Sequence, residues 1–456
     1  MALSLNGSAA SVRLISHACV IIEVDGVSIL TDPWLTGTAF NNSWRLVTPA
    51  ADLGPHLDEI DYIWISHEHP DHFHIPSLRS LPADFRRRVP VLFQQSSDHP
   101  KMVKALTGML GFSEVVLLPH KKWTPLKNGV SVLCYQSRQL DSALAVRGEG
   151  GTVLNVNDCD LSAHDLSSLV RTVGPVDFLL NQFSIAGFDG VEANLGGAAK
   201  AVLDDVVTAH KALRPRATIP FASFSYFAAS DNRFLNDHGN TPRRLADRFA
   251  EEGLELVALL PGQQAVLGEP HDNGPVLDAY DAIYAGRDEL EYLQSDAVPF
   301  ETLEAAFAKL LAKARGMHGS LGLKLLKPVV IGVPDLGLSV LMSLRDGRFE
   351  RTEAAPSIEI NSQPLQFMLS NDFGLQTLGV SGRLRVHGDH GNWFRHRVLL
   401  AMLNASVGLA PRQIFSRRQI GYFWSRRGDL LPQIRHTASR ALGSGAALAR
   451  RSTARS

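Results

Sequence analysis

The stretch His67-Glu68-His69-Pro70-Asp71-His72 decides the fold that we predict for this chain. It places three imidazoles next to carboxylates and follows Ile60 to Ser66 (IDYIWIS), whose short apolar run predicts a buried strand. The first two histidines point the same way if strand geometry continues, whereas Asp71 and His72 need a turn to serve a second ion. Imidazole and carboxylate are ligands that zinc, iron and manganese accept, so we expect one or two metal ions here. The alternative is a polar turn without metal.

Strands are expected on both sides of this stretch. The segment Ser11 to Asp32 predicts a β-hairpin, because two apolar runs flank Asp25-Gly26, a dipeptide that favours the type I′ turn. A later hairpin is predicted from two strands that Gly148 to Gly151 joins, and its second strand ends at Asp158. The four predicted strands are Ala18 to Val24, Val27 to Leu30, Ala143 to Arg147 and Thr152 to Asn157.

Helix-strand units follow the hairpins. Three helical patterns are each followed by a strand candidate, and this order suits an α/β sandwich of two sheets with helices on each outer face. The predicted helices are Ala163 to Val173, Gly196 to Ala212 and Pro242 to Glu252, and the strands are Val176 to Asn181, Ala217 to Phe224 and Leu254 to Leu260.

The length of 456 residues predicts two or three domains. Gly268 to Gly274 (GEPHDNG) is polar and rich in turn residues, so we place the end of a metal-binding catalytic domain, residues 1–270, at this point. Residues 275–410 are expected to form a smaller α+β domain, which faintly resembles sterol-carrier-like lipid-binding domains in Ile358 to Gly379. Residues 411–456 are expected to be a basic segment that is partly disordered.

Positive charge is concentrated in this C-terminal segment. It contains ten arginines and one acidic residue, Asp429, although the formal net charge of the whole chain is -1. Arg417-Arg418 and Arg426-Arg427 bracket Tyr422-Phe423-Trp424, a pattern that suits docking on an anionic surface or a nucleic acid. The alternative is a solvated tail without a specific role. In either case we expect the metal site to survive removal of the segment.

Composition favours a soluble globular protein, with 45% hydrophobic and 20% charged residues. Three scattered cysteines (Cys19, Cys134 and Cys159) without a C-x-x-C motif predict a reducing compartment, by default the cytoplasm. The first residues lack the pattern of a signal peptide, and no apolar run reaches the length of a membrane span. We therefore expect no transmembrane segment.

The His67–His72 stretch, together with several others, resembles the metallo-β-lactamase superfamily over about residues 11–265. Within it, the likeness is greatest to the branch that contains CMP-N-acetylneuraminate hydroxylase and N-acylphosphatidylethanolamine phospholipase D. The resemblance implies an αββα sandwich. The other matching stretches are Ser16-His17-Ala18-Cys19, Thr31-Asp32-Pro33-Trp34-Leu35, Leu154 to Cys159 and Pro220-Phe221-Ala222.

The resemblance also implies the ligands of the metals. His67 and His69 would bind one ion, Asp71 and His72 would bind the second, and Asp158 would bridge the two. A turn carboxylate without metal is the alternative for Asp158, since Asp and Asn favour turns. Asp160 is a weaker candidate for the bridging role.

Two histidines that are usual in the family are missing. Before Asp141, where a third histidine for the first ion is expected, the chain reads Gln136-Ser137-Arg138-Gln139-Leu140. The last histidine for the second ion is absent near residues 220–231. Either His17, His164 or His238 completes the ligand shells, or the site is open and holds one ion.

His17, Asp32 and Asp71 are the candidates for catalytic roles. His17 is assigned to the first strand of the predicted hairpin, and Asp32 lies at the hairpin's other end. His17 therefore either approaches the metals or the substrate, or is a buried histidine bonded to Asp32. Cys159, beside the predicted bridging ligand, is interpreted as a small core residue and not as a nucleophile.

The resemblance makes a non-haem iron hydroxylase, a monooxygenase, the leading expectation, because missing ligands leave positions open for dioxygen. The chain lacks the C-x-H and C-x-x-H pairs of a Rieske cluster, so its electrons would come from a separate electron-transfer protein. The implied substrate is a small molecule, either a sugar nucleotide or another glycoconjugate. One alternative is a zinc-dependent hydrolase of a phosphodiester or ester. The other is a non-enzymatic ligand-binding module with a degenerate metal site.

Overall fold

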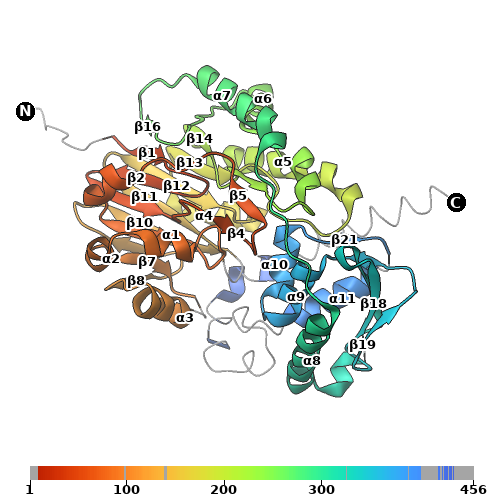
Figure 1. The fold of residues 1–456 in the computed structure, drawn as a ribbon. Helices are drawn as coiled ribbons and strands as arrows, with labels where there is room; N and C mark the ends of the chain where they lie inside the picture. Colours follow the sequence, from red (N-terminus) through yellow and green to blue (C-terminus); the bar gives the residue numbers. More distant parts are fainter. Residues whose placement is uncertain are drawn as a thin grey trace, which may run out of the picture.

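The computed structural model describes residues 9–96, 99–137, 141–324, 326–388 and 390–401, and parts of the stretch 420–435. In the first part of the chain two large sheets lie face to face, and a smaller sheet with its own helices follows (Figure 1). The predicted sandwich with a smaller C-terminal α+β unit is thereby confirmed.

Seven strands form the first sheet, in the order β16-β1-β2-β3-β6-β7-β8. The strands from β3 to β8 run parallel, whereas β1, β2 and β3 are antiparallel. The predicted hairpin is present as β2 and β3, and Asp25 and Gly26 have φ angles of 47° and 70°, as a type I′ turn requires. The strands are β1 (Ser11–Leu14), β2 (Val20–Val24), β3 (Val27–Thr31), β6 (Tyr62–Ile65), β7 (Val91–Gln94), β8 (Val115–Leu118) and β16 (Gln264–Val266).

Six strands form the second sheet, in the order β14-β13-β12-β11-β10-β9. The strands β9 to β12 are antiparallel, and β12, β13 and β14 are parallel because helices connect them. The strands are β9 (Trp123–Pro125), β10 (Ser131–Ser137), β11 (Asp141–Gly148), β12 (Gly151–Asn157), β13 (Phe178–Gln182) and β14 (Ala217–Phe221).

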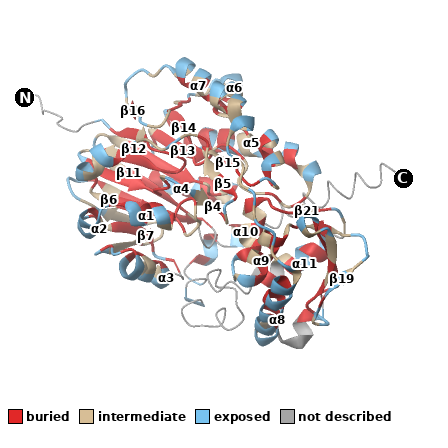
Figure 2. Cartoon of the chain, in the orientation of Figure 1, coloured by how far each residue is buried: buried red, intermediate tan, exposed pale blue. Residues whose placement is uncertain are grey.

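Helices cover both outer faces, so the sandwich has four layers (Figure 2). The alternation of side chains along β6 illustrates this, because Trp64 points into the core between the sheets, whereas Ile63 and Ile65 pack under the helices of the outer face. The helices of the first sheet are α1 (Ile75–Ser80), α2 (Ala83–Arg88) and α3 (His99–Lys104). Those of the second sheet are α4 (Ala163–Val173) and α5 (Leu195–Leu213), followed by α6 (Pro242–Glu251) and α7 (Asn273–Ala285).

A smaller unit follows, with a five-stranded sheet in the order β19-β18-β17-β20-β21 and a hydrophobic core of its own. Its strands are β17 (Val329–Val333), β18 (Leu338–Ser343), β19 (Arg348–Thr352), β20 (Ile358–Glu359) and β21 (Arg385–Val386). Its helices are α8 (Phe300–Leu323), α9 (Ser362–Ser370), α10 (Gly374–Ser381) and α11 (His390–Ala401). Helices α9 and α10 face a small third sheet of the sandwich, built from β4 (Thr38–Ala39), β5 (Trp44–Leu46) and β15 (Ser225–Phe227) (Figure 1).

Arg383 connects the smaller unit to the sandwich. Its side chain is buried, and Nε donates to both carboxylate oxygens of Asp231, at 2.8 and 3.0 Å. Nη1 donates to Gln363 at 3.0 Å and Nη2 donates to Ser295 at 2.9 Å. A second contact joins the side-chain amides of Asn41 and Gln363. These buried polar contacts fix the position of α9 and α10 beside the sandwich.

One strand that we predicted for the sandwich is not formed. Leu254 to Leu260, predicted as a strand, makes only a single bridge, from Leu256 to Thr218, so the prediction was wrong. Leu256, Ala258 and Leu259 are buried, and the apolar pattern therefore reflects packing on the core without a ladder.

The domain boundary near residue 270 stays a prediction, and we propose to count α7 with the sandwich because its buried residues join that core.

Candidate metal centre

Three strand ends meet at one edge of the sandwich and carry the polar side chains of the site. Asp32 directly follows β3, His67 follows β6 after one residue, and Asp158 directly follows β12. Since β3 and β6 are parallel neighbours, their ends lie side by side, and the amide of Asp32 donates to the carbonyl of Trp64 at 3.0 Å. Asp32 and Asn157 have φ angles of 34° and 58°, which turn the chain sharply at two of these ends.

A tight turn brings the second half of the histidine stretch back toward the first. The amides of His72 and Phe73 both donate to the carbonyl of His69, at 3.0 and 2.7 Å. The predicted turn is thus present. It places Asp71 and His72 deep in the molecule, while His69 stays partly exposed.

His17 reaches the same place from the connection between β1 and β2. The amides of Ile15 and Ser16 donate to the carbonyl of Cys19, at 2.9 and 3.0 Å, and close this turn. The carbonyl of His17 accepts from the amide of Ala222 at 2.9 Å. Our assignment of His17 to a strand was wrong, because the backbone turns before β2 begins.

One group of candidate ligands consists of His67, His69 and Asp158, whose donor atoms all lie within 4.8 Å of one another. His67 Nε2 lies 2.7 Å from His69 Nδ1 and 3.6 Å from Asp158 Oδ2. Asp141 Oδ1 lies 3.9 Å from the same His67 nitrogen. Asp141 was not among the ligands that we predicted. Its position at the start of β11, opposite Ser137, is the signal that could have identified it as a candidate ligand.

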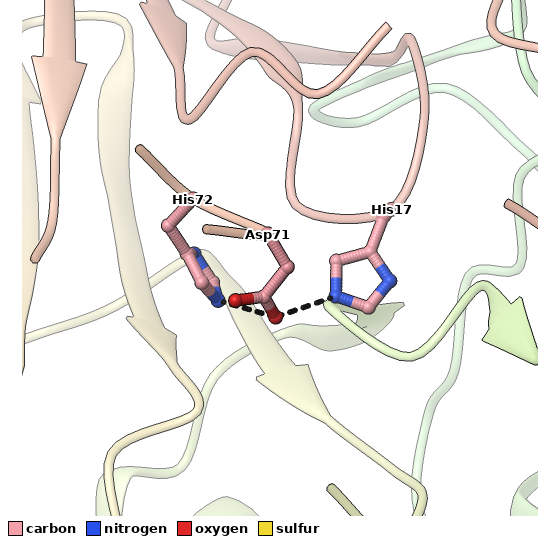
Figure 3. Close-up of side chains that lie close together, drawn as sticks. All are labelled: His17, Asp71 and His72. Carbon is pink, nitrogen blue, oxygen red and sulfur yellow. Dashed lines mark ion pairs between the residues drawn. The ribbon is translucent and has the colours of Figure 1, made fainter. Parts of the chain in front are cut away.

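A second group consists of His17, Asp71 and His72, all of them buried (Figure 3). Asp71 Oδ2 lies between the two imidazoles, 3.4 Å from His17 Nε2 and 3.3 Å from His72 Nε2. His72 Nε2 also lies 3.6 Å from Asp158 Oδ2. Asp158 is therefore equally close to a histidine of each group, which is the position that a bridging ligand needs.

Several polar atoms of these groups are buried and lack a hydrogen bond within the described part of the chain. They are His17 Nδ1 and Nε2, Asp71 Oδ1, His72 Nε2 and Asp158 Oδ1. Burying a polar atom without a partner costs free energy, so such atoms rarely gather without a ligand. Together with the donor types, these orphaned atoms fit a site for two metal ions.

Hydrogen bonds behind the groups orient the imidazoles. Asp32 Oδ2 accepts from His72 Nδ1 at 2.9 Å and from the hydroxyl of Ser66 at 2.7 Å. Because the Ser66 hydroxyl donates to Asp32, it accepts from His67 Nδ1, which lies at 2.9 Å. Nδ1 of both histidines thus serves as a donor, and Nε2 faces the site as the atom that would ligate a metal.

Charge is strongly coupled within the site. Burial and the neighbouring His72 and His69 lower the pKa of His67 to about 3, so this imidazole is neutral. Burial opposes protonation of His72, but Asp71, Asp158 and Asp32 outweigh it and raise its pKa well above the ordinary value. Burial opposes the charge of Asp71, yet His72 and His17 hold its pKa well below the usual range. The buried carboxylates thus require positive charge beside them, which a protonated His72 or a bound cation supplies.

The structure brings together some of the proposed replacement ligands and separates others. Of the three histidines considered, His17 lies in the site, whereas His164 Nε2 faces Asp429 at 3.0 Å and His238 lines a separate surface hollow. Asp160 belongs to neither ligand group among the described residues. The alternative in which His17 is a buried histidine bonded to Asp32 was wrong. The Asp32 carboxylate instead accepts hydrogen bonds from His72, Ser66 and Asn157.

The position of the missing third histidine is covered from the C-terminal segment. Gln136 and Ser137 are buried at the end of β10, and Arg426 Nη2 donates to the carbonyl of Gln136 at 2.5 Å. Most of the predicted basic segment, 411–456, lies outside the described residues. Arg426, Asp429 and Gln433 are described and buried, so this portion packs against the sandwich. Sequence reasoning missed that contact.

Residues 11–164 match the family model described as the beta-lactamase superfamily domain. The cytidine monophosphate-N-acetylneuraminic acid hydroxylase of Danio rerio is 25% identical over 272 residues, which make up 56% of this chain. The chain contains a beta-lactamase superfamily domain. The match spans 45% of the length of the Danio rerio protein, so the chain aligns with about half of that relative.

Two solved structures overlie 57% of the chain at 17% sequence identity. One is the metallo hydrolase Igni18 from Ignicoccus hospitalis, with a TM-score of 0.42 and 99% of its chain covered. The other is CmlA, a diiron β-hydroxylase from Streptomyces venezuelae, with a TM-score of 0.40 and 54% covered. No helix among the described residues is long and apolar enough to cross a bilayer.

Proposed function

We propose that this metallo-β-lactamase-fold protein is a non-haem iron hydroxylase that acts on a small molecule. The observation that carries the proposal is the composition of the two ligand groups: each offers two histidines and one carboxylate. Two imidazoles and a carboxylate with open positions are typical of non-haem iron oxygenases. The name of the Danio rerio relative, a hydroxylase, supports the same reaction class.

In this proposal His67, His69 and Asp158 hold one ion, His17, Asp71 and His72 hold the other, and Asp158 is shared. Iron held there would supply the activation of dioxygen. The chain's own residues orient the ligands through Asp32 and Ser66 and keep the second group away from water, since His17, Asp71 and His72 are buried. The cysteines are free and buried, burial raises the pKa of Cys159, and among the described residues no cysteine belongs to either ligand group.

Hydroxylation inserts one oxygen atom of dioxygen into a C–H bond and releases the other as water, which consumes a pair of electrons and a pair of protons. The proposal therefore includes a separate electron-transfer protein as partner. The free cysteines agree with a reducing compartment, and we place the protein in the cytoplasm on that ground. The relative's printed name suggests a sugar nucleotide or another glycoconjugate as substrate.

A zinc-dependent hydrolase of an ester or phosphodiester is the second candidate. Asp141 favours it, because a further carboxylate 3.9 Å from His67 Nε2 would fill one of the open positions. Zinc in such sites lowers the pKa of bound water to near 7 and so supplies hydroxide. The non-enzymatic alternative has less support, because the His67–His72 ligands and Asp158 converge.

Oxygen consumption tests the proposal. Protein loaded anaerobically with ferrous iron should consume dioxygen when a chemical reductant is supplied, and the His67→Ala variant should not. The control is His56→Ala, which changes an intermediately exposed histidine of the same sandwich whose Nδ1 lies 3.3 Å from Glu59 Oε2. Equal rates for wild type and His67→Ala would count against the hydroxylase, and hydrolysis of a generic ester by the zinc-loaded protein would favour the second candidate.

A further inference from the structure

A cavity of about 550 Å³ lies between the sandwich and the smaller unit. The loop after β4, the histidine stretch and α3 line one side of it, and α9 and α10 line the other. Its volume is that of a site for a small molecule. The lining is rich in apolar side chains, among them Phe40, Phe73, Met102, Phe367 and Phe373.

The cavity reaches the candidate metal centre through His69. This histidine lines the cavity and belongs to the first ligand group. The ring of Phe40 lies edge-on to the His69 imidazole, with 6.0 Å between the ring centroids. On the far side, the rings of Phe367 and Phe373 also meet edge to face, at 5.9 Å. Aromatic side chains thus lead from the surface to a predicted ligand.

The charge of the cavity disfavours a nucleotide. Among the described residues that line it there is neither lysine nor arginine, and Glu68 contributes a carboxylate. The phosphates of a nucleotide would lack a cationic partner here. A second hollow of about 870 Å³ shares His69, Gln376 and Val380 with the cavity and contains the charged residues Asp189, Asp205 and Arg397. The apolar cavity therefore meets, at His69, a second hollow whose lining includes three charged residues.

We propose that the apolar cavity binds the aliphatic chain of an amphiphilic substrate, whose polar part lies in the neighbouring hollow. The inference rests on the proposed function, because it takes the surroundings of His69 as the place of reaction. It favours an amphiphile over the sugar nucleotide as the substrate class, since the described lining of the apolar cavity includes neither lysine nor arginine, and Arg397 lies in the neighbouring hollow. It also gives the smaller unit a role, because Phe367, Phe373 and Thr377 of that unit complete the walls.

Binding of straight-chain alcohols to the full-length protein tests the proposal without any turnover. Calorimetric titration with 1-hexanol, 1-heptanol and 1-octanol should give affinities that rise about threefold to fourfold per methylene, as expected for burial of a CH₂ group. Cytidine monophosphate serves as the nucleotide probe and should not compete with 1-octanol.

Two variants locate the binding. Phe373→Ser removes a half-exposed ring from the cavity wall, and Thr377→Arg puts a cation into the cavity, so each should weaken 1-octanol binding about tenfold or more. The matched control is Phe394→Ser, which removes a similarly exposed phenylalanine of α11 that does not line the cavity. Circular dichroism verifies that all three variants are folded.

Unchanged 1-octanol affinity in both cavity variants, or displacement of 1-octanol by cytidine monophosphate, would overturn the inference. The iron content of the same samples tests the proposed function separately from the cavity assignment. Alcohol binding that depends on Phe373 and Thr377 upholds the cavity assignment even in protein that binds zinc alone. Iron-loaded protein that consumes dioxygen but binds no alcohol upholds the hydroxylase and overturns the cavity assignment.

Discussion

Asp158 lies between the two ligand groups, and its Oδ2 is 3.6 Å from His67 Nε2 and from His72 Nε2. In the described part of the chain, Asp71 pairs with His17 and His72, the other members of the second group. The Asp158→Ala variant should therefore lose both ions, whereas Asp71→Ala should retain the first. Metal content per chain after identical dialysis measures this difference.

The control for this pair is Asp160→Ala, which removes a nearby carboxylate that is in neither ligand group. Circular dichroism excludes global unfolding. A folded Asp158→Ala protein with its full metal complement would remove Asp158 from the ligand set. A carboxylate that only caps a turn costs about 0.5 to 2 kcal/mol when lost, and would leave the metals bound.

We propose that Asp32 orients His72 for metal binding. Its Oδ2 accepts hydrogen bonds from His72, Ser66 and Asn157, and an asparagine there would present an amide to some of these donors. Loss of such an orienting carboxylate typically weakens metal binding about 10- to 100-fold. We expect this loss for Asp32→Asn in competition with a chelator, and no change for Asp52→Asn, which alters an exposed loop carboxylate. Equal metal affinities would mean that His72 needs no orientation.

The ligand run itself was predictable, because its residues are contiguous and follow an apolar strand. His17 was one of three histidines under consideration, and spacing could not choose among them. The choice depends on the β1–β2 turn, which packs through the carbonyl of His17 against Ala222, a residue about two hundred positions away. The role of Asp32 was open for the same reason, since its partner His72 comes from another strand end.

At the level of elements, the hairpin and the helix-strand order followed from turn residues and periodicity. The strand expected at 254–260 failed because burial alone produces the same apolar pattern as a ladder. The C-terminal contact was unpredictable because no local pattern marks it. Arg426, Asp429 and Gln433 each find partners that lie more than two hundred residues earlier in the chain.

Asp429 tests whether that C-terminal element stabilises the sandwich. Its carboxylate accepts from His120 at 3.0 Å, Lys121 at 2.5 Å and His164 at 3.0 Å. Burial works against its charge, but these three partners outweigh burial and lower its pKa well below the ordinary value. A depressed carboxyl pKa contributes stability that is present above the ordinary pKa of about 4 and is lost as the pH falls below it.

At pH 7 the Asp429→Asn variant should therefore unfold at a lower urea concentration than wild type, with a free energy of unfolding that is lower by roughly 2 kcal/mol. This difference should shrink below about pH 4. Asp288→Asn is the control, because Asp288 pairs with Arg233 while largely exposed, and such pairs contribute at most about 1 kcal/mol. A difference that is constant with pH would show that the Asp429 charge is irrelevant. Equal free energies of unfolding at pH 7 would mean that the C-terminal segment around Asp429 is dispensable for stability.

At the scale of the whole molecule, Arg383 holds the smaller unit against the sandwich. Its guanidinium is buried and pairs with Asp231, a partly exposed carboxylate that also accepts from Asn361, so Arg383→Ala removes the charged partner of Asp231. Breaking a fully buried pair costs about 3 to 5 kcal/mol, and we expect a loss at or below the lower end of that range for this partly exposed pair. Arg385→Ala, which removes a partly exposed pair with Glu192, should cost less than about 1 kcal/mol. Urea unfolding compares the two, and equal losses would mean that the Arg383 contact does not secure the interface.

We propose that two groups, each of two histidines and a carboxylate, hold iron. Elemental analysis of full-length protein purified without added metal, combined with Mössbauer spectroscopy of the iron-enriched protein, tests this proposal. We expect up to two irons per chain, with the spectrum of coupled ions that share a carboxylate, and loss of both in Asp158→Ala. Stoichiometric zinc with no iron, retained through exposure to ferrous salts, would contradict the hydroxylase and favour the hydrolase.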